Sequence, residues 1–164
     1  MNSSLQVKKD MNDYYFYCYS LPLEAGSIIK PGNWGRILKT YQVGSPANPW
    51  VLVRELVFEQ VRREYYRDKP SRLESLFLCT TLDGIREFKN ATNRQWDIIY
   101  RVQILDTSTP IHVSDWTLAN FQNGDNFSAL EARAAMYWKA EGVGKTELLT
   151  TSNVRVVEMI DTGL

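Results

Sequence analysis

The carboxylate of Glu147 has the setting in this sequence that best fits chemistry. It lies at the opening of a short strand pattern over 146–150, which a turn at Ser152-Asn153 joins to a second alternating run that ends near Ile160. A carboxylate at the start of a strand is a fixed negative charge on a rigid edge, and it stabilises a positive charge that develops during a reaction. A strand-opening Glu is also commonly a solvated surface residue, so this pattern alone leaves both interpretations open.

Two further segments carry side chains suited to binding. Tyr17-Cys18-Tyr19 lies within an aromatic-rich run over 14–20, a composition that favours strands. Arg72 directly precedes a buried strand pattern over 73–79, and Ser75 and Phe77 lie within it. A helix pattern over 82–90 follows. Each has a structural alternative: Phe77 and Cys18 suit a hydrophobic core, and Arg72 suits the exposed end of a helix.

A longer helix is predicted upstream of Arg72. Asn48 is a suitable N-cap with Pro49 at the first helical position, and the helix pattern covers Trp50–Tyr66. Its predicted apolar side holds Val53, Leu56, Val57, Val61 and Tyr65. Its predicted solvated side holds Glu55, Glu59, Arg62 and Arg63.

The remaining segments mix strands and helices irregularly. The sequence predicts a loop over 31–48, strands over 97–105 and 111–113, a helical turn over 116–121, and a helix opened by a capping box at Ser128–Glu131. Because strands and helices do not alternate, we expect an α+β fold with a mostly antiparallel sheet. Residues 1–12 are expected to be loose, and 13–164 to form a single domain.

Composition excludes several classes of function. The 19 basic and 19 acidic residues cancel, which disfavours duplex nucleic acid and anionic membranes as partners. Two isolated cysteines and a single histidine predict neither a disulfide framework nor a metal site. No segment has the features of a signal peptide or a membrane span, so we expect a soluble, cytoplasmic protein.

The order of the three segments resembles that of the ADP-ribosyltransferase fold, in which NAD lies in a cleft between two small sheets. In the diphtheria-toxin and poly-ADP-ribose polymerase branch, the first strand carries His-Gly-Ser, the second ends in an aromatic residue before a helix, and the third opens with Glu. Cys18-Tyr19-Ser20, Phe77 and Glu147 occupy the corresponding places. A closer resemblance is to bacterial and phage members with the pattern Pro-Ser-Arg-x-x-Ser-x-Phe, which Pro70-Ser71-Arg72-Leu73-Glu74-Ser75-Leu76-Phe77 fits.

Two departures from the family pattern bear on activity. No histidine stands on the first strand, where Tyr17 or Cys18 replaces it. Lys145-Thr146-Glu147 holds one carboxylate rather than Glu-x-Glu, which disfavours Arg-specific transfer.

The resemblance implies a role for each site residue. Glu147 would be the catalytic carboxylate, holding a ribose hydroxyl of NAD and offsetting an oxocarbenium-like charge. Phe77 and nearby tyrosines would stack on nicotinamide, Arg72 would pair with the pyrophosphate, and Ser75 would bind a ribose or the carboxamide. The remaining NAD-binding candidates, on the first strand, are Tyr17, Cys18 and Tyr19.

The implied function is mono-ADP-ribosyl transfer from NAD, without a metal, to a protein or nucleic-acid acceptor. A toxin, a phage factor that modifies its host and a defence component are all compatible with it. Two alternatives are a catalytically degraded binding module of the same fold, which the missing histidine favours, and an NAD glycohydrolase.

Overall fold

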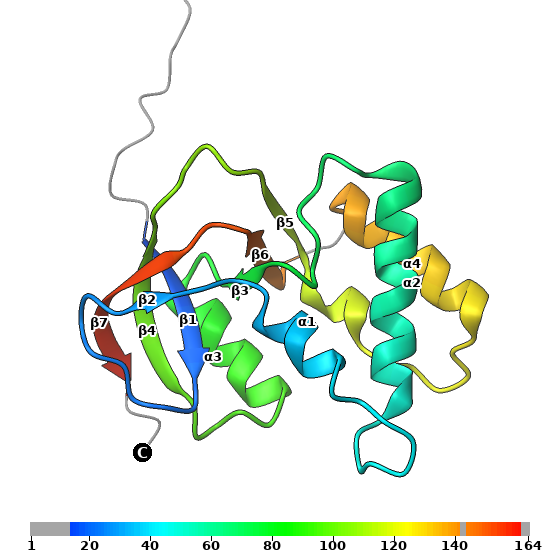
Figure 1. The fold of residues 1–164 in the computed structure, drawn as a ribbon, viewed down its shortest axis with the longest axis horizontal. Helices are drawn as coiled ribbons and strands as arrows, with labels where there is room; N and C mark the ends of the chain where they lie inside the picture. The colour runs from blue at the N-terminus through cyan, green and yellow to red at the C-terminus, as the bar shows by residue number, and fades with distance from the viewer. Residues whose placement is uncertain (1–13, 142–143, 162–164) are drawn as a thin grey trace, which may run out of the picture.

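The computed structural model describes residues 14–141 and 144–161, which form two antiparallel sheets flanked by helices (Figure 1). One sheet has four strands in the order β1-β4-β7-β2, and the other has three in the order β3-β6-β5. The strands are β1 (Tyr14–Tyr19), β2 (Ile28–Ile29), β3 (Leu76–Leu78), β4 (Ile98–Ile104), β5 (Ile111–Asp115), β6 (Thr146–Thr150) and β7 (Val154–Asp161). The helices are α1 (Asn33–Leu38), α2 (Pro49–Tyr65), α3 (Leu82–Ala91) and α4 (Phe127–Lys139), with a 3-10 turn η1 at Trp116–Ala119. The predicted α+β class with antiparallel sheets is confirmed.

The two sheets share a core, and a backbone bridge joins their edges. Tyr100, Val102 and Val154, from β4 and β7, are fully buried in the cluster beneath the four-stranded sheet. Between the sheets, Phe16 and Cys79 exchange two backbone hydrogen bonds of 2.9 and 2.8 Å. The sheets are therefore joined beside β1 and β3 by the bridge as well as through their shared core.

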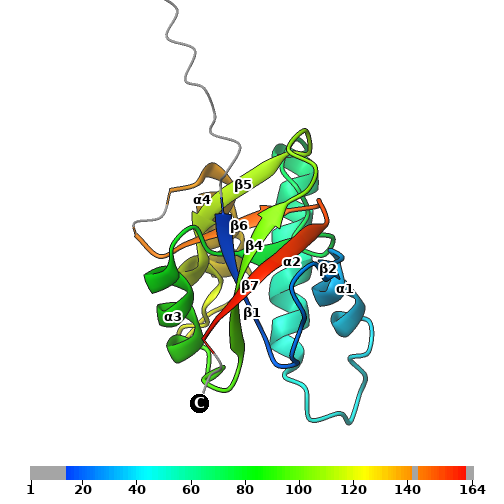
Figure 2. The ribbon, with the colours of Figure 1, turned by 90° about the vertical axis from the view of Figure 1, so that its left-hand side faces the viewer.

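The predicted C-terminal strands form, but they pair with different sheets. β6 lies between β3 and β5, whereas β7 lies between β4 and β2. The turn at Ser152-Asn153 thus carries the chain from one sheet to the other (Figure 2). Glu147 lies near the start of the central strand β6, where it pairs with Ser114 of β5.

Helices α2 and α4 pack together on the far side of the three-stranded sheet (Figure 1). Asn48 caps α2 as predicted, accepting a hydrogen bond from the Trp50 amide at 3.0 Å, with Pro49 at the first position. The indole Nε1 of Trp138 donates to the carbonyl of Phe58 at 2.8 Å and ties the two helices together. None of the described helices is long and apolar enough to cross a membrane.

The predicted faces of α2 are partly wrong. Val57 and Val61 are buried as expected, but Leu56 is 55 % exposed and Tyr65 is 72 % exposed. Two residues assigned to solvent, Glu55 and Glu59, are 1 % and 7 % exposed instead, and the side chain of Arg62 is only 14 % exposed. These charged side chains are buried because they are paired. Glu59 pairs with Arg62 and Arg63 on α2 itself, and Glu55 pairs with Arg54 on α2 and with Arg72 from another segment.

Two helix boundaries also differ from expectation. The predicted loop over 31–48 contains α1, whose Gly35 lies so close to the Leu73 carbonyl that an added Cβ would be 2.3 Å from it. Helix α4 begins at Phe127, because Asn126 rather than Ser128 is the N-cap and accepts from the Ala129 amide at 3.0 Å. The expectations for residues 1–12, and for residue 13 as the start of the domain, lie outside the described residues.

Candidate functional site

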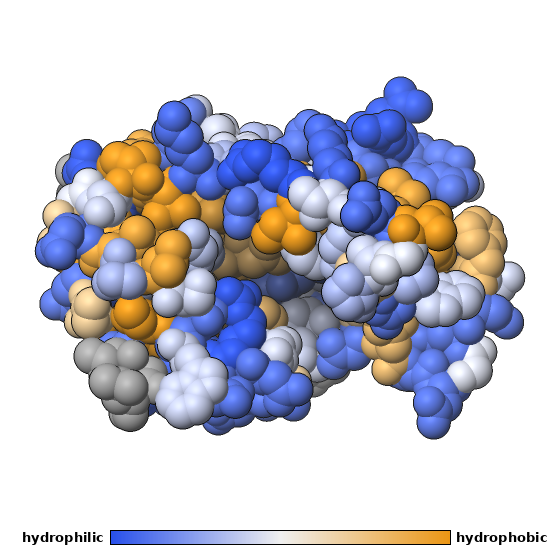
Figure 3. Space-filling view, turned by 60° about the horizontal axis from the view of Figure 1, so that its bottom comes forward, coloured by the Kyte–Doolittle hydropathy of each residue, from blue (hydrophilic) through white to orange (hydrophobic). Residues whose placement is uncertain are grey.

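A cavity of about 550 Å³ lies where the two sheets part. Figure 3 shows this face of the molecule, with the surface hollowed near its centre. The cavity walls come from β1, the β3 segment, α1, α2, α3, η1 and the start of β6. Every site residue predicted from the sequence lines it: Tyr17, Cys18, Tyr19, Arg72, Ser75, Phe77 and Glu147.

Glu147 is held in one orientation by two donors to the same oxygen. Arg72 Nη1 donates to Glu147 Oε1 at 2.6 Å, and Tyr137 Oη donates to the same oxygen at 2.7 Å. The other oxygen, Oε2, accepts no hydrogen bond from the residues that the structure describes. A carboxylate fixed through one oxygen keeps the second available for a ligand in the cavity.

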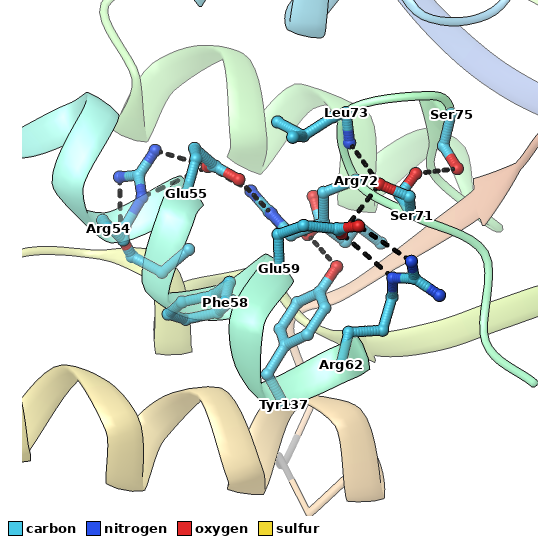
Figure 4. Close-up of polar contacts among 12 residues, drawn as sticks. Arg54, Glu55, Phe58, Glu59, Arg62, Ser71, Arg72, Leu73, Ser75 and Tyr137 are labelled. Carbon is cyan, nitrogen blue, oxygen red and sulfur yellow. Dashed lines mark hydrogen bonds and ion pairs between the residues drawn. The ribbon is translucent and has the colours of Figure 1, made fainter. Parts of the chain in front are cut away.

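The guanidinium of Arg72 is shared between two carboxylates. Its Nε and Nη2 donate to Glu55 Oε2 and Oε1 at 2.9 and 3.1 Å, in the bidentate geometry that fixes a guanidinium plane. Figure 4 shows Arg72 beside Glu55, and its third nitrogen, Nη1, donates to Glu147. Glu55 therefore orients Arg72, which in turn orients Glu147.

Aromatic rings surround this buried ion network. The Arg72 guanidinium carbon lies 4.9 Å from the ring centres of both Phe77 and Tyr137, and 5.6 Å from that of Phe58. Burial acts to lower the pKa of Arg72, but Glu55 leads the opposing causes and the pKa lies well above its usual value. Burial and the Glu147 carboxylate raise the pKa of Tyr137 well above its usual value, so its phenol stays a neutral donor.

Glu55 and Arg54 are the site residues that the sequence interpretation missed. Burial acts to raise the pKa of Glu55, but Arg72 and Arg54 together hold it below the usual range. Arg54 donates to Glu55 Oε1 through Nη2 at 2.8 Å and to the carbonyl of Ala119 in η1 at 2.8 Å. A signal was present, since Glu55 lies three residues from both Leu52 and Phe58 and therefore falls beside the apolar side of α2.

The Pro-Ser-Arg segment forms a turn that presents Arg72. Ser71 Oγ donates to Glu59 Oε2 at 2.8 Å and accepts from the Leu73 amide at 3.2 Å. Ser75 Oγ donates to the Ser71 carbonyl at 2.7 Å, which closes the turn. Ser75 lines the cavity, but its hydroxyl proton is used within the fold, so it meets a ligand as an acceptor.

The β1 wall is aromatic and uncharged at neutral pH. The half-buried rings of Tyr17 and Tyr19 stack with centres 6.1 Å apart. Burial raises the pKa of Tyr17 to about 12 and that of Cys18 to about 11, which keeps both protonated. Cys18 is therefore a poor nucleophile, as expected for a buried thiol without a base.

The site thus combines one oriented carboxylate with aromatic walls and buried arginines. No group of three His, Cys, Asp or Glu side chains is placed to hold a metal ion within 14–141 and 144–161. Ligand pockets of about 300–1,000 Å³ with few polar groups are typical of small-molecule sites. The arrangement can stabilise a positive charge that develops beside Glu147 and can stack a flat ring along β1 or Phe77.

The family can now be stated beside this geometry. A family profile described as "Protein of unknown function (DUF2441)" matches residues 10–162. The chain belongs to the DUF2441 family. A comparison with curated protein sequences finds no significant match. The matched range of DUF2441 covers both sheets and all the residues that line the cavity, so the network around Glu147 lies entirely within the family's domain.

Proposed function

We propose that this protein transfers ADP-ribose from NAD to a macromolecular acceptor, with Glu147 as the catalytic carboxylate. The observation that carries the proposal is the position of Glu147: a single carboxylate that accepts two hydrogen bonds and lines a cavity walled by residues of both sheets. The likeness to ADP-ribosyltransferases in the order of the three segments supports the same assignment. Fold likeness alone does not establish a function, so the chemistry of the site carries the argument.

A lone carboxylate is sufficient for this bond cleavage. Hydrolysis of an ordinary glycoside needs a second carboxyl group because the leaving alkoxide must be protonated. In NAD, the bond between ribose C1′ and the nicotinamide nitrogen breaks with its electron pair going to a ring that was already cationic, so nicotinamide departs neutral. The sugar is left as an oxocarbenium-like cation, and the site needs one negative charge to stabilise it.

Each neighbouring residue has a task in this reaction. Glu147 Oε2 accepts from a ribose hydroxyl and lies beside the developing charge, while Arg72 and Tyr137 keep the side chain in place. The acceptor nucleophile then forms a bond to C1′ and gives up its proton to solvent water. Loss of one preorganised group of this kind typically costs about 10²–10³ in rate.

The aromatic walls account for nicotinamide binding in the proposal. Tyr17 and Tyr19 offer ring faces from β1, and Phe77 lines the same cavity from β3. One face of Phe77 already lies against the Arg72 guanidinium, so the ligand meets the remaining face or edge. The acceptor is a protein or nucleic acid, and water in its place gives NAD glycohydrolase activity from the same residues.

The decisive test is nicotinamide release from labelled NAD in cell lysate. We expect Glu147→Gln, which keeps the shape of the side chain, to lower release by about 10²–10³. The matched control is Glu64→Gln, on the exposed surface of α2, which should release nicotinamide at the wild-type rate. Equal release by both variants would exclude Glu147 as the catalytic group.

The fate of the ADP-ribose label separates the possible reactions. Label on protein or nucleic acid indicates a transferase, whereas free ADP-ribose from purified protein alone indicates a glycohydrolase. A binding module would release no nicotinamide from NAD. The open cavity, with Glu147 and Arg72 converging on it, favours the catalytic reading over that alternative.

A further inference from the structure

The cavity lining is more positive than the protein as a whole. Three arginines and one carboxylate line it, Arg54, Arg72, Arg94 and Glu147, although the whole chain has a formal net charge of zero. The carboxylates of Glu55 and Asp97, which pair with these arginines, are not part of the lining. With these two carboxylates included the charges cancel, so binding of an anionic ligand depends on an arginine donor that is left without a partner.

Two of the three arginines are fully engaged within the protein. Each nitrogen of Arg72 donates to Glu55 or Glu147. Arg54 donates to Glu55 through Nε and Nη2, and to the Ala119 carbonyl through Nη1. Neither guanidinium has a nitrogen left without a hydrogen-bond partner, so the pyrophosphate role expected for Arg72 falls to another cation.

Arg94 differs from the other two in having a free terminal nitrogen. Its Nε and Nη2 pair with Asp97 Oδ2 at 2.7 and 2.6 Å, and Nη2 lies 3.4 Å from the Cys18 carbonyl that accepts from it. Its Nη1 makes no hydrogen bond to any residue that the structure describes, and 40 % of the side chain is exposed. The guanidinium is thus held in place with one amino group left over, which lowers the entropy cost of binding a ligand.

The turn between α3 and β4 fixes this arrangement at the cavity. The Arg94 amide donates to the Lys89 carbonyl, and the Asp97 amide donates to the Arg94 carbonyl, both at 2.9 Å. Lys89 forms no ion pair within the described part of the chain, so Arg94, Asp97 and Lys89 together carry a net charge of plus one. The hydrogen bond to Cys18 places Arg94 beside the aromatic β1 wall, at the same cavity as Glu147.

From these contacts we infer that Arg94 is the phosphate-binding residue of the cavity and takes the diphosphate of a nucleotide through Nη1. The identity of that nucleotide as NAD rests on the proposed function. In this arrangement the diphosphate lies at the α3–β4 turn and the nicotinamide ribose lies at Glu147. A guanidinium suits this task because it binds phosphate oxygens with directed N–H donors.

Calorimetry with ADP and adenosine tests the inference without catalysis. We expect ADP to bind the wild-type protein, more weakly as salt is raised, and adenosine to bind less tightly. Arg94→Met should weaken ADP binding about 10- to 100-fold, the range expected for hydrogen bonds to a charged group, and leave adenosine binding unchanged. The control Arg86→Met lies on α3 outside the cavity, where a 3.9 Å contact to Asp83 holds a half-exposed side chain, and should bind ADP normally.

The outcomes separate this inference from the proposed function. Undiminished ADP affinity in Arg94→Met, or no ADP binding to the wild type at millimolar concentration, overturns the assignment of Arg94 even if NAD is cleaved. ADP binding through Arg94 without nicotinamide release upholds the phosphate site and refutes the transferase. If Arg94→Met does not fold because Asp97 is left unpaired, the double variant Arg94→Met/Asp97→Asn removes both charges, and the same loss of ADP affinity is expected.

Discussion

Replacing Arg72 by methionine should destabilise the fold strongly, because the change leaves two buried carboxylates short of a partner. The guanidinium makes three hydrogen bonds, two to Glu55 and one to Glu147. Glu55 is 1 % exposed and Glu147 is 5 % exposed, so water cannot replace the lost contacts fully. Removing one partner of a buried ion pair typically costs about 3–5 kcal/mol, and we expect the free energy of unfolding at pH 7 to fall by that amount. This is a large part of the stability of a typical domain, about 5–15 kcal/mol.

The loss should also depend on pH. The arginines hold the pKa of Glu55 below its usual value of 4.5. In the wild type its ion pairing therefore stabilises the fold above that pH, and this stabilisation is lost as pH falls through the lower folded pKa. In Arg72→Met the Glu55 carboxylate lacks its main partner. Protonation then removes the buried negative charge and with it the cost of its desolvation. The difference in unfolding free energy between the two proteins should therefore shrink between pH 7 and pH 4.5.

Urea unfolding at both pH values measures this difference. Arg63→Met is a matched control, since Arg63 also pairs with a buried glutamate, Glu59, but its side chain is 72 % exposed. An exposed pair of this kind contributes about 0–1 kcal/mol. If Arg72→Met is no more destabilised than Arg63→Met at pH 7, or if its deficit is the same at both pH values, the network does not stabilise the fold as argued. A double variant, Arg72→Met with Glu147→Gln, should lose less than the sum of the two single changes.

Three further outcomes are expected. Tyr137→Phe removes a donor to the Glu147 carboxylate and should lower the free energy of unfolding, measured in urea, by about 1.5–3 kcal/mol. An unchanged urea midpoint would contradict the hydrogen bond. Gly35→Ala should lower the free energy of unfolding by about 1–3 kcal/mol despite the higher helix propensity of alanine, because the new Cβ would lie 2.3 Å from the Leu73 carbonyl oxygen. A rise in melting temperature would refute that contact. Burial raises the pKa of Cys18 to about 11 and that of Cys79 to about 12, so neither thiol should react with iodoacetamide at pH 8 until the protein is unfolded, and rapid labelling of the native protein would contradict both values.

Local signals in the sequence predicted most of the elements correctly. Asn48-Pro49 marked the start of α2, and alternation over 97–105 marked β4. Glu147 could be singled out because its strand pattern is short, apolar and bounded by turns, all of which are local features. Helix α1 was missed because glycines at positions 32 and 35 are typical of loops, whereas here the helix depends on close contact with the backbone at Leu73.

The buried charges around the site could not be predicted in the same way. A helical pattern assigns Glu55 and Glu59 to solvent because charged residues are rarely buried without partners. Each also has a partner from another part of the chain, Arg72 for Glu55 at 17 residues and Ser71 for Glu59 at 12 residues further on, beside the arginines of α2 itself. Arg72 was identified as a site residue, yet its role as a support for Glu147 follows only from the three hydrogen bonds that the folded structure gives it.

The division of β6 and β7 between the two sheets has a consequence for how the chain folds during synthesis. β6 is the central strand of one sheet, and β7 lies between β4 and β2 in the other. Neither sheet can close before residues 146–161 have left the ribosome, and until then β3 and β5 are separated and β2 lacks its partner. Pairings such as Ile28 with Arg155 span most of the chain and slow the search for the native state. The nascent protein should therefore expose unpaired strand edges and depend on chaperones. This state ends when both sheets form, which is also when Glu147 reaches its place in the site.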